Sequence, residues 1–170
     1  DQGIALFSAT GSCDMGRALA PKVAKRLGRS LLELGGNNAA IVCKSADLDL
    51  TIKGITFSAA GTTGQRCTTL RRLFVHSEVH DVVLTKLKKA FSHLKIGDPM
   101  DRNTQVGPLI SEQSFKQMQE KLTSCKSKGL TVTGGDRIDH ATEIYVTPAI
   151  VETKEHIDEM NEETFAPILY

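Results

Sequence analysis

A single cysteine in a stretch rich in glycine and threonine is the residue best suited to chemistry in this sequence. The stretch GTTGQRCTTLRR, residues 61–72, contains Cys67. A thiol attacks a carbonyl as the thiolate, which is a small fraction of an ordinary cysteine at neutral pH. Gly64 permits a tight turn that brings main-chain amides near the sulfur, and Arg66 and Arg71 add positive charge. The pattern therefore predicts either a nucleophile or a small buried residue that leads into a strand.

A glutamate followed by two glycines is the second candidate. In LLELGGNN, residues 31–38, Glu33 ends an apolar run, where an ionised carboxylate is costly unless it is paired. Such a carboxylate is a candidate general base. The structural alternative is that Glu33 caps the amides of the turn at Gly35 and Gly36, and the spacing leaves both interpretations open.

A third glycine cluster, TGSCDMGRA, has the GxxxxG spacing of a phosphate-binding loop from Gly11 to Gly16. A nucleoside triphosphatase would need Lys and then Ser or Thr after the second glycine, where this chain has Arg17 and Ala18. The diphosphate of a dinucleotide needs only main-chain donors and a small residue such as Ser12. The cluster therefore predicts either a dinucleotide site or a plain turn between a strand and a helix.

Cysteine and histidine positions give no signature of a metal site or of a second hydrolytic centre. The cysteines are widely spaced and lack a CxxC pair, which is typical of reduced thiols rather than of a disulfide framework or a zinc site. His76 and His80 are expected to straddle a strand end and a helix start, so they would not share a helical face. A cysteine-histidine hydrolase would need a histidine facing Cys67, and no histidine stands in such a motif. No metal ligand set is predicted.

The elements that must position these candidates alternate along the chain. Short apolar runs predict strands over 4–8, 30–34, 39–43, 73–76, 130–133 and 144–151. Longer amphipathic runs predict helices over 14–27, 48–60, 78–94 and 112–128. This alternation predicts an α/β fold with a mostly parallel sheet flanked by helices.

Residues at the helix ends sharpen these boundaries. The predicted caps and the predicted stop are Asp47, Ser77, Ser111 and Gly129. The helical spacing of the last helix places Cys125 on its apolar face, in the core. Pro21 lies inside the first predicted helix, where it predicts a kink or marks the first turn.

Composition limits the class of protein. The chain has 170 residues, 40% of them hydrophobic, and a formal net charge of +1. Neither nucleic acid nor an anionic membrane surface is favoured as a partner, and no apolar run is long enough to span a bilayer. Reduced thiols favour the cytoplasm or the mitochondrial matrix. Apolar runs close to both ends, GIALF and FAPILY, predict a segment of a longer protein.

Several motifs in order resemble the NAD(P)-dependent aldehyde dehydrogenase superfamily. They are TGSCDMGR, LLELGGNNAAIV, GQRCTT and NEETFAPILY, which together span essentially the whole chain. Asn37, Asn38 and the form ETFAP resemble the antiquitin branch, which oxidises α-aminoadipic semialdehyde. The resemblance implies a truncated aldehyde dehydrogenase catalytic fold. Residues 1–32 would be the C-terminal remnant of a Rossmann-like cofactor domain, and residues 33–170 a catalytic domain that is incomplete at its C-terminus.

The resemblance also implies roles for individual residues. Cys67 would attack the aldehyde carbon to give a thiohemiacetal and then a thioester, with its own amide in the oxyanion hole. Glu33 would activate the water that hydrolyses the thioester. Arg66 would meet an acidic or amino-acid-like end of the substrate. The residues implied to contact NAD or NADP are Gly11 and Ser12 at the pyrophosphate, Leu34 and Gly35 beside the nicotinamide, and Glu163 and Phe165 at the nicotinamide ribose.

Two functions are therefore expected from different classes. The first is oxidation of a small aldehyde, including a semialdehyde, by a family whose full-length members are homo-oligomers. The second is a truncated remnant that keeps the fold and the thiol without dehydrogenase turnover, with at most an esterase-like activity or an interaction role. Ala9 and Cys13 depart from the usual residues around the pyrophosphate turn of the family.

Overall fold

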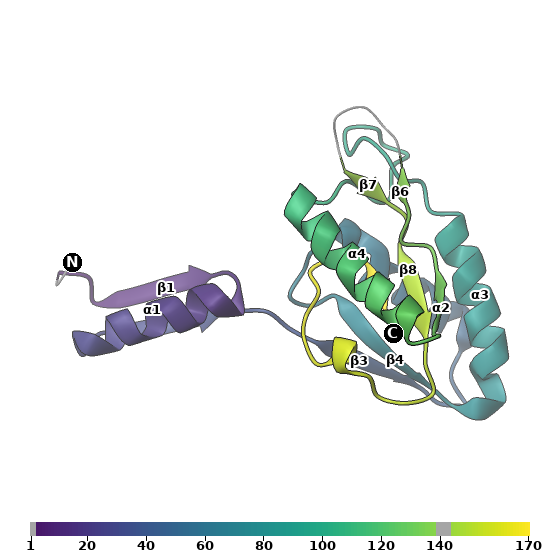
Figure 1. The fold of residues 1–170 in the computed structure, drawn as a ribbon, viewed down its shortest axis with the longest axis horizontal. Coiled ribbons are helices and arrows are strands. Elements are labelled where there is room, and N and C mark those ends of the chain that lie inside the picture. Colours follow the sequence, from purple (N-terminus) through teal and green to yellow (C-terminus); the bar gives the residue numbers. More distant parts are fainter. Residues whose placement is uncertain (1–2, 139–143) are drawn as a thin grey trace. The chain divides into compact units, whose positions relative to one another are not determined.

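The computed structural model describes residues 3–138 and 144–170. The chain forms two compact units, Asp1–Gly36 and Asn37–Tyr170, called here the first and the second unit (Figure 1). None of the helices in the described residues is long and apolar enough to cross a bilayer.

The first unit consists of two strands and one helix. Strand β1 (Leu6–Thr10) pairs in parallel with β2 (Arg29–Glu33), and helix α1 (Cys13–Lys25) connects them. Pro21 lies well inside α1, so the alternative that it marks the first turn is wrong. The helix begins after Ser12, whose hydroxyl accepts a hydrogen bond from the Met15 amide at 3.1 Å.

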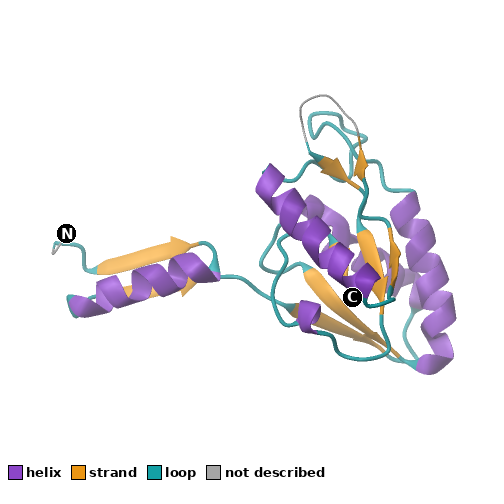
Figure 2. Ribbon diagram, in the orientation of Figure 1, coloured by secondary structure: helices purple, strands orange, loops and turns teal. Residues whose placement is uncertain are grey.

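The second unit holds the remaining elements (Figure 2). Its helices are α2 (Leu48–Ala60), α3 (His80–Ser92) and α4 (Glu112–Ser127), with 3-10 turns at Gly61–Gly64, Ser77–Val79 and Asp158–Met160. Its strands are β3 (Asn38–Val42), β4 (Leu70–Val75), β5 (Thr131–Thr133), β6 (Arg137–Ile138), β7 (Tyr145–Val146), β8 (Ala149–Glu152) and β9 (Ile168–Leu169).

Most strands of the second unit form one sheet. Strands β3 and β4 pair in parallel, β8 and β9 pair in parallel, and β5 joins β8 in the antiparallel sense. Tyr170 connects the two halves, because its amide donates to the Arg71 carbonyl at 2.8 Å and its carbonyl accepts from the Leu73 amide at 2.7 Å. The order is therefore β3-β4-β9-β8-β5, which confirms the predicted α/β class with mostly parallel pairing.

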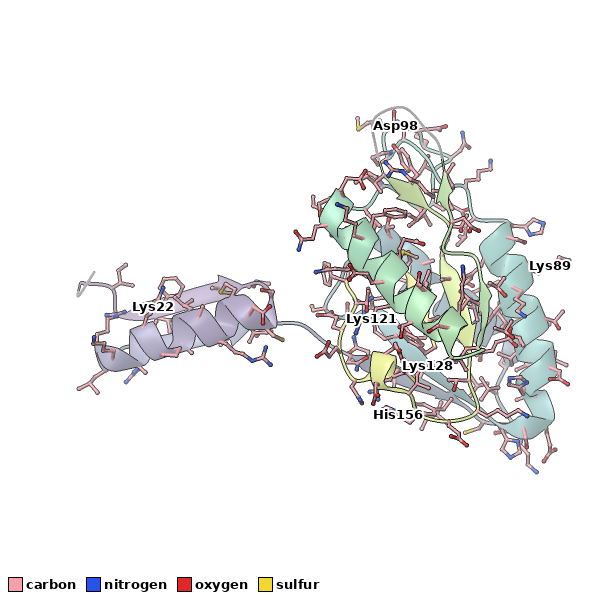
Figure 3. All side chains as sticks on the ribbon, viewed as in Figure 1. Lys22, Lys89, Asp98, Lys121, Lys128 and His156 are labelled. Carbon is pink, nitrogen blue, oxygen red and sulfur yellow. The ribbon has the colours of Figure 1, made fainter. Side chains whose placement is uncertain are left out.

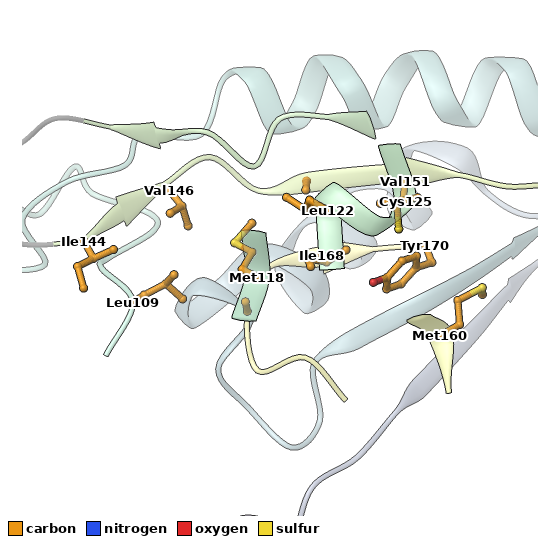
Figure 4. Packing of buried hydrophobic residues seen from close by; sticks show 12 residues of the cluster. Leu109, Met118, Leu122, Cys125, Ile144, Val146, Val151, Met160, Ile168 and Tyr170 are labelled. Carbon is orange, nitrogen blue, oxygen red and sulfur yellow. The ribbon is translucent and has the colours of Figure 1, made fainter. Parts of the chain in front are cut away.

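Helices cover both faces of this sheet, and strand alternation assigns each buried residue to a face. Ile150 and Leu169 pack into the cluster formed by α2 and α3. Val151 and Ile168, their neighbours in sequence, pack into the cluster of α4 (Figure 4). Cys125 lies in that cluster with no exposed surface, as its helical spacing predicts. The exposed Lys89 side chain projects outward from α3, whereas Lys121 on α4 pairs with Glu162 (Figure 3).

The predicted strand over 144–151 is wrong. The chain changes partners at Thr147 and Pro148, so that β7 pairs with β6 whereas β8 pairs with β5 and β9. Pro148 has no amide hydrogen to continue a ladder, and Thr147 instead exchanges hydrogen bonds with Gly135 and Asp136. Strands β6 and β9 have only two residues each, which is too short for a periodic pattern.

The capping predictions are confirmed at Asp47 and Ser111 and wrong at Ser77. The Asp47 carboxylate accepts hydrogen bonds from the amides of residues 49 and 50, and Ser111 caps α4. At the third helix, residues 77–79 form a 3-10 turn, and the His76 ring nitrogen accepts the Glu78 amide at 3.3 Å. Helix α3 therefore begins at His80. Gly129, with φ +78°, ends α4 as predicted.

Candidate active site

Cys67 lies on a tight turn between α2 and β4. The Thr69 amide donates to the Arg66 carbonyl at 3.0 Å, and the Arg66 amide donates to the Thr69 hydroxyl at 3.2 Å. These bonds place Cys67 in the middle of a β-turn. The residue is exposed, so the alternative of a buried small residue is wrong. No acceptor is found in the described residues for the main-chain N–H of Cys67.

The turn is preceded by an unusual run of left-handed backbone. Thr62, Thr63 and Gly64 have φ values of +54°, +55° and +66°. Threonine rarely adopts this region, at a cost of about 1–3 kcal/mol per residue. Thr63 is held there by a hydrogen bond from its hydroxyl to the Gly107 carbonyl at 2.7 Å. A Cβ on Gly64 would lie 2.4 Å from the carbonyl carbon of Ala166, so only glycine allows this close approach.

Asn38, at the start of β3, holds the turn at residues 66–69, called here the cysteine turn. Its side-chain amide donates to the carbonyl oxygens of Cys67, at 2.7 Å, and Thr69, at 2.9 Å. Asn37 donates to the Met160 carbonyl at 2.7 Å. Sequence reasoning used this asparagine pair only as a mark of one family branch. The sequence did contain a signal for this role: two adjacent side-chain amides at the start of an apolar strand. Each can donate hydrogen bonds to main-chain carbonyls that are not paired in a β-sheet.

Gln65 connects the cysteine turn to the loop over residues 107–110. Its side-chain oxygen accepts the Ile110 amide at 2.8 Å, and its side-chain nitrogen donates to the Pro108 carbonyl at 3.1 Å. Three contacts therefore hold the backbone around Cys67: the Asn38 hydrogen bonds, the Gln65 hydrogen bonds and the packing of Gly64 against Ala166. Sequence reasoning missed the role of Gln65, because a glutamine in a loop gives no directional signal.

Arg71 is a buried cation that contacts residues 162–167, called here the EETFAP segment. The residue is 2% exposed. Its guanidinium donates to the Ala166 carbonyl at 2.8 Å and to Glu163 Oε1 at 3.2 Å. Burial lowers the pKa of Arg71, and the Glu163 carboxylate opposes that effect. The sequence suggested that Arg71 supports a thiolate, whereas in the structure its partners are Glu163 and main-chain carbonyls.

Arg66 is also engaged by other groups. Its guanidinium donates to the Phe57 carbonyl at 3.0 Å and lies over the Phe57 ring, 4.8 Å from the centroid. The side chain is half-buried against the end of α2. The cation beside Cys67 in the sequence is therefore held by α2 through both a hydrogen bond and a cation–π contact.

Glu163 and Phe165 both contact Arg71. The Glu163 side chain is 19% exposed, and one of its oxygens is bonded to Arg71. The Ala166 amide donates to the Thr164 carbonyl at 2.7 Å, which makes a narrow turn around Phe165. Phe165 is 41% exposed, and its ring centroid is 5.7 Å from the Arg71 guanidinium carbon. Through Arg71, the second unit thus links the Arg66 carbonyl, which directly precedes Cys67, to Glu163 and to the Ala166 carbonyl beside Phe165.

The other predicted site residues gather in the first unit, at the carboxyl ends of its strands. The Gly11 amide donates to the Glu33 carbonyl at 3.0 Å. In the described residues, the amides of Cys13 and Asp14 at the start of α1 have no acceptor. Such free amides at a helix N-terminus can hold a phosphate. The described residues contain no group of three His, Cys, Asp or Glu that could bind a metal ion.

The Glu33 side chain is exposed in the first unit. It makes no hydrogen bond or ion pair with any residue that the structure describes, so the alternative that it caps the turn at Gly35 and Gly36 is wrong. Leu34 packs on α1, where a Cβ on Gly16 would lie 2.6 Å from a Leu34 methyl carbon. The unit therefore fixes the backbone at Glu33 and leaves its carboxylate free to meet water or a ligand.

Curated proteins of similar sequence match the whole chain. α-Aminoadipic semialdehyde dehydrogenase from Bos taurus is 44% identical over 171 residues, which cover all of this chain and 32% of that protein. Aldehyde dehydrogenase family 7 member A1 from Brassica napus is 41% identical and is covered to 34%. The chain therefore spans about a third of the length of the curated relatives that it matches.

Solved structures and a family model agree with this similarity. An Escherichia coli NADP dependent enzyme has a TM-score of 0.92 at 34% identity, with 99% of this chain and 35% of that chain covered. Betaine aldehyde dehydrogenase from Staphylococcus aureus in complex with NAD+ has a TM-score of 0.93 at 25% identity, with 99% and 34% covered. The model of the aldehyde dehydrogenase family matches residues 1–170. On this match, together with a cysteine turn and an EETFAP segment held in one network, the chain belongs to the aldehyde dehydrogenase family.

Proposed function

We propose that this protein oxidises a small aldehyde to a carboxylic acid, with Cys67 as the nucleophile and NAD or NADP as the oxidant. The observation that carries the proposal is the exposed thiol of Cys67, whose carbonyl accepts from Asn38 and whose amide has no acceptor among the described residues. The Cys67 sulfur attacks the aldehyde carbon, and a C–S bond forms. The carbonyl oxygen becomes an oxyanion, which the free amide of Cys67 can stabilise.

The oxidation step requires a hydride acceptor. NAD or NADP, when bound, would supply that acceptor for a hydride from the thiohemiacetal carbon. The thioester then formed on Cys67 is attacked by water, which releases the acid and returns the thiol. Glu33 is the proposed base that takes a proton from this water, and its exposed carboxylate, which has no partner among the described residues, supports that role.

The residues proposed to hold the dinucleotide fit its chemistry. Gly11 and Ser12 stand at the N-terminus of α1, where the amides of Cys13 and Asp14, which have no acceptor among the described residues, can meet the diphosphate. Leu34 and Gly35 follow β2 and would lie beside the nicotinamide. Glu163 has one oxygen bonded to Arg71, which leaves the other for a ribose hydroxyl, and the half-exposed Phe165 ring can pack beside it. On this proposal, residues 1–32 belong to the cofactor domain and residues 33–170 to the catalytic domain.

A semialdehyde is the proposed substrate class, because the relative from Bos taurus is named for α-aminoadipic semialdehyde. Arg66 is the proposed contact for the acidic end of such a substrate. Its hydrogen bond to the Phe57 carbonyl would have to be shared or exchanged. We also propose that the protein is a homo-oligomer. We propose a reducing compartment for it, such as the cytoplasm or the mitochondrial matrix, because three of its free cysteines are exposed.

A second candidate function is hydrolysis of esters by the same thiol. This reaction needs Cys67 and a base but no hydride acceptor. It is the activity expected if the chain supplies the cysteine turn without a competent dinucleotide site. The exposure of Cys67 within a unit that holds its own backbone network favours this candidate over a remnant without any chemistry.

One set of assays separates these functions. NADH or NADPH formation is measured with a small aldehyde, and hydrolysis is measured with an aryl ester, for the parent and for Cys67→Ser. Cys43→Ser, which removes another exposed thiol, is the matched control. Aldehyde oxidation that is lost in Cys67→Ser and kept in Cys43→Ser supports the first function. Ester hydrolysis alone supports the second, and equal activity of Cys67→Ser and the parent overturns both.

A further inference from the structure

We propose that Arg71 is a positioning residue that fixes the Glu163 carboxylate for the dinucleotide and joins it to the cysteine turn. The inference rests on the proposed function and deepens it, because it assigns a specific cation to the cofactor-holding segment. Arg71 is not among the residues that family resemblance implies.

The acceptors around Arg71 belong to both parts of the site. One terminal nitrogen donates to the Ala166 carbonyl at 2.8 Å, and the other lies 3.2 Å from Glu163 Oε1 and 3.4 Å from the Arg66 carbonyl. Arg66 directly precedes the cysteine, whereas Ala166 directly follows Phe165. A planar guanidinium holds its acceptors in a fixed fork, so these groups are positioned relative to one another.

The surroundings make this arrangement rigid. Arg71 is 2% exposed, so water does not compete for its donors. The adjacent Gly64 packs directly on the peptide between Ala166 and Pro167, where a Cβ would lie within 2.5 Å of backbone atoms. The backbone that precedes the cysteine turn therefore contacts the backbone of the EETFAP segment directly, and Arg71 donates hydrogen bonds to both segments.

The consequence for the cofactor concerns one carboxylate. Arg71 holds Oε1 of Glu163, which orients the plane of the carboxylate and leaves Oε2 for a ribose hydroxyl. The same guanidinium lies 5.7 Å from the centroid of the Phe165 ring. Both side chains proposed to contact the ribose therefore depend on Arg71. Loss of the fork should weaken cofactor binding much more than it weakens the reactivity of the Cys67 thiol.

The test uses Arg71→Lys, which keeps the charge but loses the fork, and Glu163→Gln, which keeps the shape but loses the charge. Their double variant completes a cycle. Arg72→Met is the matched control, because Arg72 donates to the Asn37 carbonyl and has no contact with Glu163 in the described residues. Three quantities are measured on the whole protein: the KM for NAD+ and NADP+, their Kd by calorimetry, and cofactor-independent hydrolysis of an aryl ester.

Arg71→Lys is expected to raise the KM and the Kd for the cofactor about tenfold, with ester hydrolysis changed by less than about threefold. The double variant should bind the cofactor no more weakly than the weaker-binding single variant, because both substitutions break the same interaction between Arg71 and Glu163. Arg72→Met should leave the cofactor Kd unchanged.

Unchanged cofactor affinity in Arg71→Lys, with a lower melting temperature, would overturn the positioning role and leave the proposed function standing. A parent that binds the dinucleotide but oxidises no aldehyde would overturn the proposed function, and the Kd values would still decide the role of Arg71. A parent that binds neither NAD+ nor NADP+ would overturn both.

Discussion

The side-chain amide of Asn38 lies 2.7 Å from the main-chain carbonyl oxygen of Cys67, although the two residues are 29 positions apart. The same amide reaches the Thr69 carbonyl at 2.9 Å. One asparagine thus satisfies two carbonyls of the cysteine turn, whereas the amide of Cys67 has no acceptor in the part of the chain that the structure describes. This relationship orients the turn so that its donor, and not its acceptor, is available to a reacting oxyanion.

Replacement of Asn38 by aspartate should lower the free energy of unfolding by about 1–3 kcal/mol, because a carboxylate would face two carbonyl oxygens without a hydrogen to donate. Alkylation of Cys67 and aldehyde oxidation should both slow. The measurements are urea unfolding and the rate of iodoacetamide labelling. Gln117→Glu, an exposed amide-to-carboxylate change on α4 with no partner among the described residues, is the control and should change neither. Equal stability of Asn38→Asp and the parent would show that the two hydrogen bonds do not hold the turn.

Gly64→Ala should destabilise the second unit by at least about 2 kcal/mol, because the residue has a left-handed φ and a new Cβ would meet backbone atoms. The built Cβ lies 2.4 Å from the Ala166 carbonyl carbon. Gly54→Ala is the matched control, since Gly54 lies inside α2 with nothing within 4 Å of its Cβ position. That control should gain about 0.5–1 kcal/mol in helix propensity. Equal changes in the free energy of unfolding of the two variants, measured by chemical denaturation, would contradict the close approach of Gly64 to Ala166.

Stability should fall in acid through Glu159. Lys128, 2.7 Å away, and then Ser124 lower the pKa of Glu159 from 4.5 to about 2, whereas burial opposes them. Because the folded pKa is depressed, the contribution is fully present above about pH 4.5 and is lost as the pH falls toward about 2. Glu159→Gln should therefore lose stability at neutral pH and converge with the parent in acid.

The control for this prediction is Glu162→Gln, since Glu162 is 79% exposed and lies 3.5 Å from Lys121. An exposed pair contributes little. Thermal unfolding from pH 2 to pH 7 should separate the two variants. Parallel curves for Glu159→Gln and the parent over this range would be incompatible with the depressed pKa.

The thiols should differ in accessibility. Cys13, Cys43 and Cys67 are exposed and should react with iodoacetamide in the native protein, whereas Cys125 should react only after unfolding. Burial also raises the pKa of the Cys125 thiol, which reduces its thiolate fraction further. Intact mass measured over time should show a pause at three added groups. Labelling of Cys125 at the rate of the others would place α4 away from its core.

Local signals in the sequence predicted the helices well. Helix α2 has the predicted bounds, Leu48–Ala60, because its cap Asp47 and its apolar spacing are both contained within the segment. Helix α4, Glu112–Ser127, begins as predicted and ends one residue earlier than predicted. Its cap, Ser111, and its apolar spacing are likewise local to the segment. The strand over 144–151 was wrong because its end depends on which distant strand each half pairs with. A continuous apolar run carries no information on a change of partner.

By itself, the sequence determined the α/β class, the core position of Cys125 and the motifs that single out Cys67, Glu33 and Glu163. These depend on residue type and short spacing. Only the tertiary structure decided where Asn38 and Arg71 donate their hydrogens. Arg71 reaches Ala166 across 95 positions, and both arginines weighed as partners of the thiol bind other groups. The reason is physical: a buried donor must find an acceptor, and which acceptor lies within about 3 Å is set by packing of distant segments.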